Sequence, residues 1–265
     1  MPIKIAASFA FETEQPTDVL LQFEAADTRE QQVLAVETSL TPAEHCTRVP
    51  AQDRIGERIW IRTKGRFDVQ YSATVNPCRL LPDITALDQV QSHDVPGEVV
   101  QYLFNSRYIP ADAFEPFVEG EFGGTRGGQR IVAMRDWIEQ HFSYQPGVSD
   151  ARTGALDTFV ERRGICRDYA HVMVALARAS TIPARYVSCY APGVTPQDFH
   201  AVAEVFLEDP SRKSGGAWYI VDATGMAAPA VTAKIGVGRD AADVSFLTSF
   251  GPSEFLFSSV EVSEV

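Results

Sequence analysis

The chain has 265 residues, of which 45% are hydrophobic and 22% are charged, the composition of a folded globular protein rather than a disordered or fibrous one. This length suffices for two modest domains that each bury a core. Asp and Glu outnumber Lys and Arg by 35 to 23, a formal net charge of -12. Such a protein repels phosphate backbones and anionic lipid surfaces, so neither nucleic acid nor a membrane is expected as a partner.

The first residues, MPIKIAASFAFETEQ, lack the sustained apolar core and the small-residue cleavage site of a secretory signal. No stretch of the sequence reaches the roughly 20 consecutive apolar residues that span a membrane. We therefore expect a cytoplasmic protein.

Four cysteines are spread along the chain without a CxxC pair and without a Cys/His pair at the spacing of zinc ligands. This pattern predicts no structural metal, no cofactor and no disulfide framework. Cys46 and Cys78 could form a disulfide only if their strands were neighbours, and a cytoplasmic protein is not expected to contain one. Both are expected to be buried or partly buried thiols.

Residues 1–90 predict a β-rich N-terminal domain. The runs KIAASFAFE, VLLQFEA and RIWIRTKGRFDVQYSATV alternate apolar and polar residues. Because this is the period of half-buried antiparallel strands, a β-sandwich-like domain is expected. The Lys64-Gly65 pair is expected to form a hairpin turn inside the third run. The segment from NPCRLLPDITALDQV to VPGEV has the composition of a loop and predicts a linker.

Residues 91–265 predict a second domain that begins with helices. A short helical pattern in GEVVQYLFNSRYI precedes EGEFGGTRGG, whose glycines predict a long loop without regular structure. The apolar residues of the next helix recur every three to four positions, at Ile131, Met134, Ile138 and Phe142. Another helix is expected in GALDTFVERR, with Thr153 as its N-cap, Asp157 in its first turn and Gly164 at its end.

The helix that opens at Cys166 is apolar around most of its circumference, including Val172, Leu176 and Ala179, and it stops before Pro183. Beyond it, ARYVSCYA, HAVAEVFLE and AWYIVDAT alternate as antiparallel strands do, and the polar DPSRKSGG joins the last two. A helix followed by three such strands predicts the α+β fold class, with the helix packed on an antiparallel sheet.

Cys166, His200 and Asp222 form a candidate catalytic site. A cysteine nucleophile needs a stabilised thiolate, a base, and a group that orients the base. Cys166 lies in the first turn of a buried helix, where unpaired N–H groups and the helix dipole favour a thiolate. His200 opens one strand and Asp222 follows the next, so the two side chains would lie adjacent if those strands pair. The backbone N–H of Cys166 would then face the oxyanion.

Each of these three residues also has a purely structural interpretation. A cysteine in an apolar helix is usually a core residue, a histidine at a strand start usually lies at the surface, and an Asp before Ala-Thr-Gly is usually a turn residue. Their occurrence together, in this order and on these elements, is less expected by chance and indicates a catalytic triad.

Several segments resemble the transglutaminase-like superfamily, many bacterial members of which are described as candidate cysteine proteases. RRGICRDYAHVMVALARA is similar to the family's Gly-x-Cys-Arg-Asp-aromatic-Ala-His stretch, and TIPARYVSCY to its Gly-Ile-Pro-Ala-Arg-Tyr-Val-Ser-Gly-Tyr. HAVAEVFL is similar to His-Ala-Trp-x-Glu-Val, and WYIVDATG to Trp-x-x-x-Asp-Pro-Thr. The resemblance covers residues 95–225, and the preceding β-rich region is similar to the one that precedes this domain in many bacterial members.

The resemblance implies a papain-like transglutaminase core in which Cys166 is the nucleophile, His200 the base and Asp222 the residue that orients the base. Thr181 and Cys189 stand where the family usually has Gly, Val202 where it has Trp, and Ala223 where it has Pro. None of these departures removes a catalytic group, although the loss of the Trp alters the wall of the site near His200.

Other polar residues near these motifs have structural roles by expectation. Asp168 is expected to stabilise the first helical turn. His171 is expected to be buried and hydrogen-bonded, and Arg185 to pair with Glu204. Tyr144 is the one side chain that we name as a candidate second oxyanion donor. The segment after Gly225 is expected to return to the sheet and to border the cleft.

The predicted activity is thiol acyl transfer on a protein or peptide substrate, through a thioester. Hydrolysis of a peptide or amide bond is favoured, because the chain lacks the additional β-domains and the acidic calcium loop of the animal cross-linking enzymes. One alternative is a protein-glutamine transglutaminase with an amine acceptor, and another is a non-catalytic peptide-binding module on the same fold. In a third interpretation, the N-terminal region docks a partner or a substrate for the attached enzyme.

Overall fold

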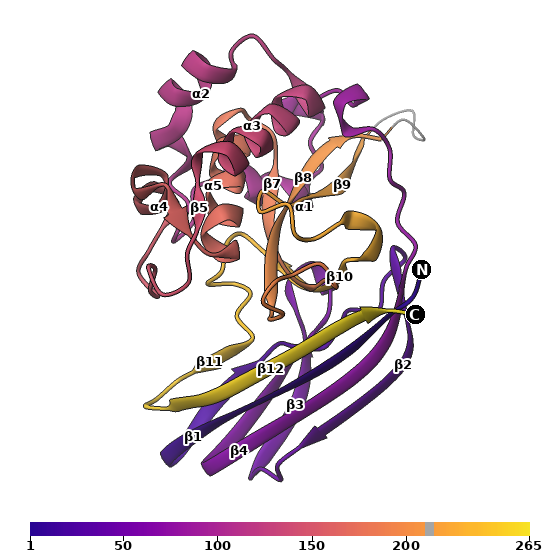
Figure 1. Cartoon of the computed structure of the whole chain (residues 1–265), viewed down its shortest axis with the longest axis vertical. Helices are drawn as coiled ribbons and strands as arrows, with labels where there is room; N and C mark the ends of the chain where they lie inside the picture. Colours follow the sequence, from indigo (N-terminus) through magenta and orange to yellow (C-terminus); the bar gives the residue numbers. More distant parts are fainter. Residues whose placement is uncertain (210–214) are drawn as a thin grey trace.

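The computed structural model describes residues 1–209 and 215–265. Helices and a four-stranded sheet make up one half of the molecule, and a larger antiparallel sheet makes up the other half (Figure 1). The α+β class expected from the sequence is therefore confirmed, as is the β-rich N-terminal region.

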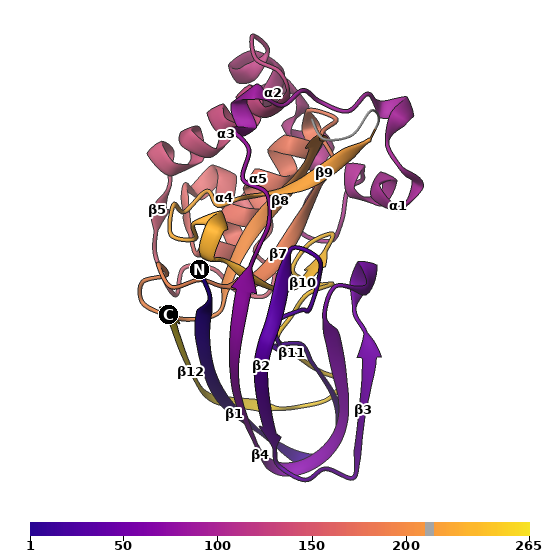
Figure 2. The ribbon, with the colours of Figure 1, turned by 90° about the vertical axis from the view of Figure 1, so that its right-hand side faces the viewer.

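The larger sheet has six strands, which form one continuous antiparallel sheet. Two long strands, β1 and β4, pair along their whole length, and shorter strands pair with one half of either long strand (Figure 2). The strands are β1 (Ile3–Leu21), β2 (Gln31–Leu40), β3 (His45–Pro50), β4 (Glu57–Pro77), β11 (Leu247–Ser249) and β12 (Glu254–Glu264).

The hairpin expected at Lys64-Gly65 is wrong, because β4 continues through these residues. Thr13 pairs with Gly65 and Thr17 pairs with Thr63, so three residues of β1 face one residue of β4. Gly65 has φ +83°, the left-handed conformation that glycine adopts without strain. The Lys-Gly pair therefore marks a bulge that bends both long strands, and it does not reverse the chain.

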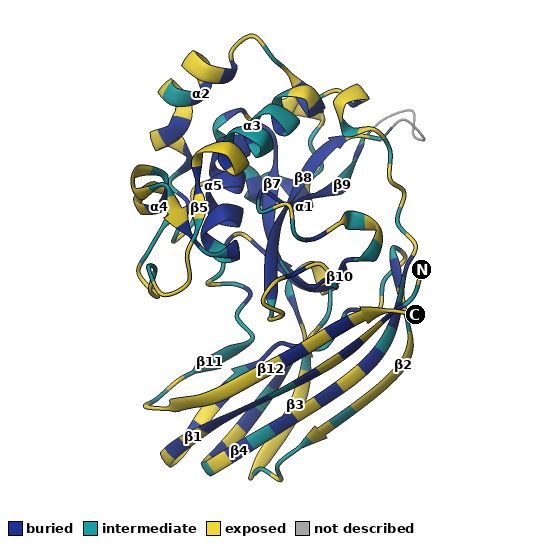
Figure 3. Ribbon diagram, viewed as in Figure 1, coloured by how far each residue is buried: buried dark blue, intermediate teal, exposed yellow. Residues whose placement is uncertain are grey.

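Alternation of apolar and polar residues decides which face of this sheet is buried. Along β1 and β4 every second residue is buried over most of their length, which appears in Figure 3 as alternating dark blue and yellow bands. The buried face carries aromatic side chains such as Phe9, Phe11 and Phe67. One face of the sheet is thus apolar and covered, and the other faces solvent.

The helical half contains α1 (Gly97–Val100), α2 (Glu115–Phe122), α3 (Gly127–His141), α4 (Ala155–Glu161) and α5 (Cys166–Ala179). The long loop expected around EGEFGGTRGG is wrong, because α2 contains its first residues and α3 begins at its last glycines. Val118 and Phe122 of α2 are buried in the main core. Burial of two such side chains outweighs the penalty of about 1 kcal/mol for Gly120 inside the helix.

The ends of α4 also differ from those expected. Gly154 is the N-cap, and its N–H donates to Asp157 Oδ2 at 2.9 Å. Thr153 Oγ1 instead accepts from the N–H of Asp150 in the preceding turn. Arg162, with φ +58°, ends the helix, and Gly164 belongs to a short strand that follows.

The second sheet has the strand order β10-β7-β8-β9 and is antiparallel throughout. Its strands are β7 (Ala184–Tyr190), β8 (His200–Glu208), β9 (Gly216–Val221) and β10 (Ala233–Gly238). Helix α5 packs on β7 and β8, and both are buried along nearly their full length (Figure 3). The polar connection expected between β8 and β9 lies largely outside the described residues.

The hydrophobic core of the large sheet includes residues of the other half. Tyr190 of β7 and Ala233 and Ile235 of β10 belong to the same apolar cluster as the buried face of the large sheet. The region that the sequence assigned to residues 91–265 also supplies β11 and β12, which pair with β1. The chain therefore enters the large sheet at its start and returns to it at the end.

Cys46 and Cys78 were expected to be buried or partly buried, but both are exposed. Cys46 lies in β3, a strand at the edge of the sheet whose residues face solvent, and Cys78 directly follows β4. All four cysteines are free thiols, and only Cys166 and Cys189 are buried. Among the helices of the described chain, none is long and apolar enough to cross a membrane.

Candidate active site

Cys166 is the first residue of α5. In the first turn of a helix the backbone N–H groups have no hydrogen-bond partner within the helix. The start of the helix is fixed by Asp168, which is fully buried and accepts the N–H of Ile165 at 2.9 Å. Arg167 pairs with the same carboxylate at 2.9 Å. Asp168 thus has the role in the first turn that the sequence predicted.

The Cys166 side chain is 9% exposed and lies in a small apolar cluster. Ala170 of the same helix, Tyr186 of β7 and Ala201 of β8 contact it there. Val244, from the segment after β10, completes the cluster. The tail returns to the sheet through β10, as expected, and Val244 of the same tail packs in the cluster that contains Cys166.

His200 is the first residue of β8, and Asp222 directly follows β9. These two strands pair antiparallel, with Ala203 opposite Val221. The pairing brings Asp222 Oδ2 to 3.1 Å from His200 Nε2. Both side chains are almost completely buried. We expected His200 and Asp222 to be adjacent if these two strands pair, and the strands do pair.

Asp222 is held by several donors in addition to the histidine. Its carboxylate accepts the N–H groups of Thr224 at 2.9 Å, Met226 at 3.0 Å and Ala227 at 2.7 Å, and the Thr224 hydroxyl at 2.8 Å. Burial acts to raise the pKa of Asp222, but the hydrogen bonds from His200 and from these backbone groups lower it below its usual value. Asp222 is thus a fixed carboxylate that orients the ring of His200.

His200 combines burial with strong stabilisation of its charged form. Burial acts to lower its pKa, but the hydrogen bond to Asp222 and the interaction with the neighbouring Cys166 side chain raise it to about 10. Nδ1 of His200 has no well-formed hydrogen bond to any residue that the structure describes. Since Asp222 occupies Nε2, Nδ1 is the ring nitrogen that remains available to the thiol.

Tyr144 lies beside the nucleophile because of a two-residue strand pair. β5 (Ser143–Tyr144) pairs in parallel with β6 (Arg163–Gly164), which ends two residues before Cys166. Tyr144 interacts with the thiol and with the backbone N–H of Cys166, and it packs on the same apolar cluster. Burial and the adjacent thiol raise the pKa of Tyr144 far above its usual value, so the phenol keeps its proton.

His171 and Ala241 were not recognised from the sequence as a linked pair. Nε2 of His171, buried in α5, accepts the N–H of Ala241 at 3.2 Å, and Ala241 packs on the cluster around Cys166. His171 is therefore buried and hydrogen-bonded, as expected. In the sequence, the only indication of this contact was that GVGRDAAD follows the strand that precedes Asp222.

Two further expectations concern charges away from Cys166. Arg185 pairs with Glu204 at 2.7 Å across β7 and β8, as predicted. Within the described ranges no group of three or more His, Cys, Asp or Glu side chains could hold a metal ion.

The sequence profile of the transglutaminase-like superfamily matches residues 118–223, which include all three candidate catalytic residues. A crystal structure of a candidate cysteine protease from Cytophaga hutchinsonii has 31% identity, covers 99% of this chain and 90% of its own, and superposes with a TM-score of 0.91. A protein of Mycobacterium leprae described as uncharacterised is 31% identical over 120 residues, which span 43% of this chain and 42% of that protein. The chain belongs to the transglutaminase-like superfamily.

Proposed function

We propose that this protein is a thiol acyl-transfer enzyme that hydrolyses peptide or amide bonds, with Cys166 as nucleophile, His200 as acid and base, and Asp222 as the orienting carboxylate. The observation that carries the proposal is the 3.1 Å contact between His200 Nε2 and Asp222 Oδ2, together with the interaction of the same ring with the Cys166 thiol at the start of α5. Nucleophile, base and orienting group are the three parts of a triad.

The reaction consists of two transfers. The Cys166 thiolate attacks the carbonyl carbon, and a C–S bond forms as the carbonyl π electrons move to oxygen. Protonated His200 gives its proton to the leaving nitrogen, the C–N bond breaks, and a thioester remains. A water molecule then loses a proton to His200 and attacks the thioester carbon, which releases the carboxylic acid and the thiolate. Asp222 stabilises the imidazolium in both transfers.

Two groups are placed to stabilise the oxyanion of each tetrahedral intermediate. One is the backbone N–H of Cys166 at the first turn of α5, and the other is the hydroxyl of Tyr144. Tyr144 interacts with that same N–H and with the thiol, so its hydroxyl lies beside the sulfur at the start of α5. We therefore assign the Tyr144 hydroxyl as the second oxyanion donor.

The proposed substrate is a protein or peptide, and the proposed location is the cytoplasm.

Water and a primary amine compete for the thioester, and the product of the reaction identifies which of them is the acceptor. Incubation with p-nitrophenyl acetate and methylamine gives acetate if water is the acceptor and N-methylacetamide if the amine is. We expect acetate to predominate, with Cys166→Ala as the blank.

The first test is alkylation of the folded protein with iodoacetamide across pH, followed by mass spectrometry of each cysteine. Cys166 is expected to react well below pH 8.5, because the pKa of a free thiol is about 8.5 and an adjacent imidazolium stabilises the thiolate. His200→Ala is expected to move the midpoint back toward about 8.5. His45→Ala, at an exposed residue of β3, should leave the midpoint in place.

Cys46 and Cys78 are exposed in the same chain and serve as internal references. If Cys166 reacts no faster than these two thiols below pH 8, no thiolate-imidazolium pair exists. The non-catalytic peptide-binding module would then be the better account of the fold.

A further inference from the structure

Glu204 lies at the centre of a buried group of charges on the side of the second sheet that faces the large sheet. Its carboxylate contacts Arg185 at 2.7 Å and Lys234 Nζ at 2.6 Å. The three side chains are 1%, 4% and 2% exposed, respectively, so none is appreciably hydrated. Burial acts to raise the pKa of Glu204, but Lys234 and Arg185 lower it to about 2.

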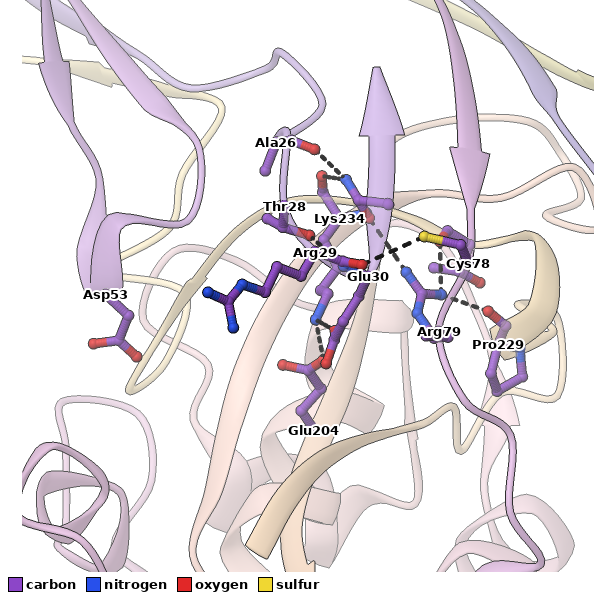
Figure 4. Close-up of polar contacts among 12 residues, drawn as sticks. Ala26, Thr28, Arg29, Glu30, Asp53, Cys78, Arg79, Glu204, Pro229 and Lys234 are labelled. Carbon is purple, nitrogen blue, oxygen red and sulfur yellow. Dashed lines mark hydrogen bonds and ion pairs between the residues drawn. The ribbon is translucent and has the colours of Figure 1, made fainter. Parts of the chain in front are cut away.

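Each of the two cations also pairs with a carboxylate in a connection between strands of the large sheet. Arg185 pairs with Asp53 Oδ2 at 3.0 Å, and Lys234 pairs with Glu30 Oε2 at 2.6 Å. Figure 4 shows Glu30 and Glu204 converging on one point, with Asp53 on one side and Arg79 on the other. Asp53 also accepts the hydroxyl of Tyr102 at 2.6 Å. Within the second sheet, Arg185 and Lys234 share the single carboxylate of Glu204. Each therefore depends on a second carboxylate from outside that sheet.

The large sheet also holds the backbone of β10. Gln31, which is fully buried, accepts the N–H of Lys234 at 2.7 Å and donates to its carbonyl at 2.8 Å. The same carbonyl accepts the N–H of Ala26 at 2.9 Å. A Cβ at Gly56 would come within 2.2 Å of the carbonyl oxygen of Ile235, so the turn after Asp53 touches β10 directly. The contact between the halves is therefore close and specific at this point.

This group of charges is tied to the candidate active site by strand register. Glu204 is four residues after His200 in β8, so both side chains lie on the same face, about 13 Å apart along the strand. Arg185 is opposite Glu204, and Cys189 is opposite His200. Lys234 of β10 is in turn opposite Cys189. The contacts from the large sheet thus reach the cross-strand row that contains His200.

We propose that Asp53, Glu30 and Gln31 are positioning residues, through which the large sheet holds β7, β8 and β10 in the register that places His200 against Cys166. The inference rests on the proposed function, since it concerns how the catalytic pair is aligned. It assigns the N-terminal sheet to the catalytic unit, as a part that the site needs in order to form, and not to a separate docking module.

Stability alone does not account for such a group. A buried ion network contributes little net stability compared with apolar residues of the same volume, because the charges lose their hydration. A network of this kind instead penalises every strand register except the one that pairs all its charges, since each unpaired charge would stay buried. The geometry is therefore that of an ion network that fixes the register of β7, β8 and β10.

Removal of the carboxylates separates positioning from simple electrostatics, because the two effects have opposite signs. Loss of a negative charge favours a nearby thiolate directly and would lower the pH at which Cys166 begins to react. Misalignment of His200 weakens the imidazolium that stabilises the thiolate and raises that pH. An upward shift can therefore come only from altered geometry.

The experiment compares iodoacetamide alkylation of Cys166 across pH in the full-length protein and in Asp53→Asn, Glu30→Gln and the double variant. Asn tolerates the left-handed conformation of residue 53, whose φ is +55°, so that substitution leaves the turn intact. We expect the midpoint to rise by about half a pH unit or more in the double variant, and by less in each single variant.

Asp68→Asn and Glu44→Gln are the matched controls, because they remove the same charges from ion pairs with Arg66 and Arg62 in the large sheet, away from β10. They are expected to leave the midpoint in place. A midpoint that stays or falls in the double variant, or that rises equally in the controls, overturns the inference. If the double variant does not fold, the same criterion applies to Glu30→Gln, whose side chain is 40% exposed.

The two proposals fail in different ways. A wild-type Cys166 that reacts no faster than Cys46 and Cys78 overturns the proposed function. A reactive wild-type Cys166 whose pH profile all the carboxylate variants leave unchanged overturns only the positioning role.

Discussion

Two buried histidines of the catalytic half have opposite shifts in pKa, and the difference lies in what each ring contacts. His200 donates from Nε2 to the carboxylate of Asp222, and the net effect raises its pKa to about 10. For His171, burial lowers the pKa to about 4, and its Nε2 accepts a backbone N–H, which only a neutral ring can do. The first ring is thus suited to hold a proton and the second to serve as a fixed acceptor.

His171 predicts that the stability of the protein depends on pH. In the unfolded chain this histidine takes up a proton below about pH 6.5, but in the folded protein it stays neutral down to about pH 4. The free energy of unfolding should therefore fall by about 3 kcal/mol as the pH falls from 6.5 to 4. His171→Gln, which retains an acceptor for the Ala241 N–H, should flatten the fall.

The measurement is urea unfolding at fixed pH values between 6.5 and 5, where Glu204 contributes little because its carboxylate is charged in the folded state, with a pKa of about 2, and mostly charged in the unfolded chain, where the pKa of Glu is about 4.3. His93→Gln, at an exposed residue, is the control and should retain the wild-type slope. If the slope is the same with and without His171, this residue is not the group that titrates.

At the scale of single residues, the sequence could predict the contacts that a short motif and the order of the strands determine. The proximity of Cys166, His200 and Asp222 and the contact of Asp168 with the first turn of α5 belong to this class. Contacts made by distant segments could not be predicted, since nothing near Cys166 in the chain indicates that Val244 packs on it.

At the scale of elements, the shortest strand pair has a large effect on the site. β5 and β6 are two residues long, yet they place Tyr144 beside the first turn of α5. A two-residue ladder contributes little stability by itself, so its position depends on the packing of Phe142 and Tyr169 around it.

Tyr144→Phe tests the proposed oxyanion donor. The substitution removes one hydroxyl and keeps the ring, so we expect the rate of p-nitrophenyl acetate hydrolysis to fall on the order of 10²-fold, as for the loss of one oxyanion-hole donor. Alkylation of Cys166 by iodoacetamide passes through no oxyanion and should continue at its usual rate. Tyr169→Phe provides a matched control, because it removes the hydroxyl of a neighbouring tyrosine whose ring packs against Tyr144 at a tilt. An unchanged hydrolysis rate in Tyr144→Phe would exclude the assignment.

Sequence pattern predicted the helices α3 and α5 and the strands β7, β8 and β9. Helix α3 buries one face, whereas α5, β7 and β8 are buried on nearly all sides and have continuous apolar runs. The periodicity failed where tertiary packing outweighed local preference, as in α2, which accommodates Gly120 because Val118 and Phe122 are buried. It failed again at Lys64-Gly65, where a bulge and a hairpin turn require the same residue types.

At the scale of the whole molecule, the core of the large sheet predicts cooperative unfolding, because it includes residues of both halves. Tyr190, Ala233 and Ile235 of the catalytic half lie within the core of the large sheet, and buried charges cross the same boundary. Loss of the large sheet would expose this apolar surface and leave Arg185 and Lys234 to share the carboxylate of Glu204, without Asp53 and Glu30, which would destabilise the other half. The two halves should therefore unfold in one transition.

The three tryptophans provide local probes of this transition. Trp60 lies in β4 of the large sheet, and Trp218 lies in β9 of the catalytic sheet. In each of two variants that keep only one of these tryptophans, the urea midpoint from fluorescence should coincide with the midpoint from far-ultraviolet circular dichroism. A Trp60 signal that changes at a lower urea concentration than the circular dichroism of the same variant would show that the large sheet unfolds independently.

The change in periodicity predicts a division of the chain into residues 1–90 and 91–265, but it does not predict the return of β11 and β12 to the first sheet. An alternating strand shows which of its faces is buried and does not show which strand it pairs with. The residues 254–264 carry a strand pattern, while their partner lies at the other end of the chain.

The pairing of β1 with β12 determines when the large sheet can be completed. Ile3 pairs with Glu264, and the register continues to Glu12 opposite Glu254, so these contacts join residues about as distant in the sequence as the chain allows. During synthesis, β1 leaves the ribosome long before β12 exists, and the N–H and C=O groups along the edge that pairs with β12 stay unpaired until residues 254–264 have been translated. The catalytic half is synthesised in this interval, so the nascent chain can assemble β7 to β10 before the sheet that supports them is closed.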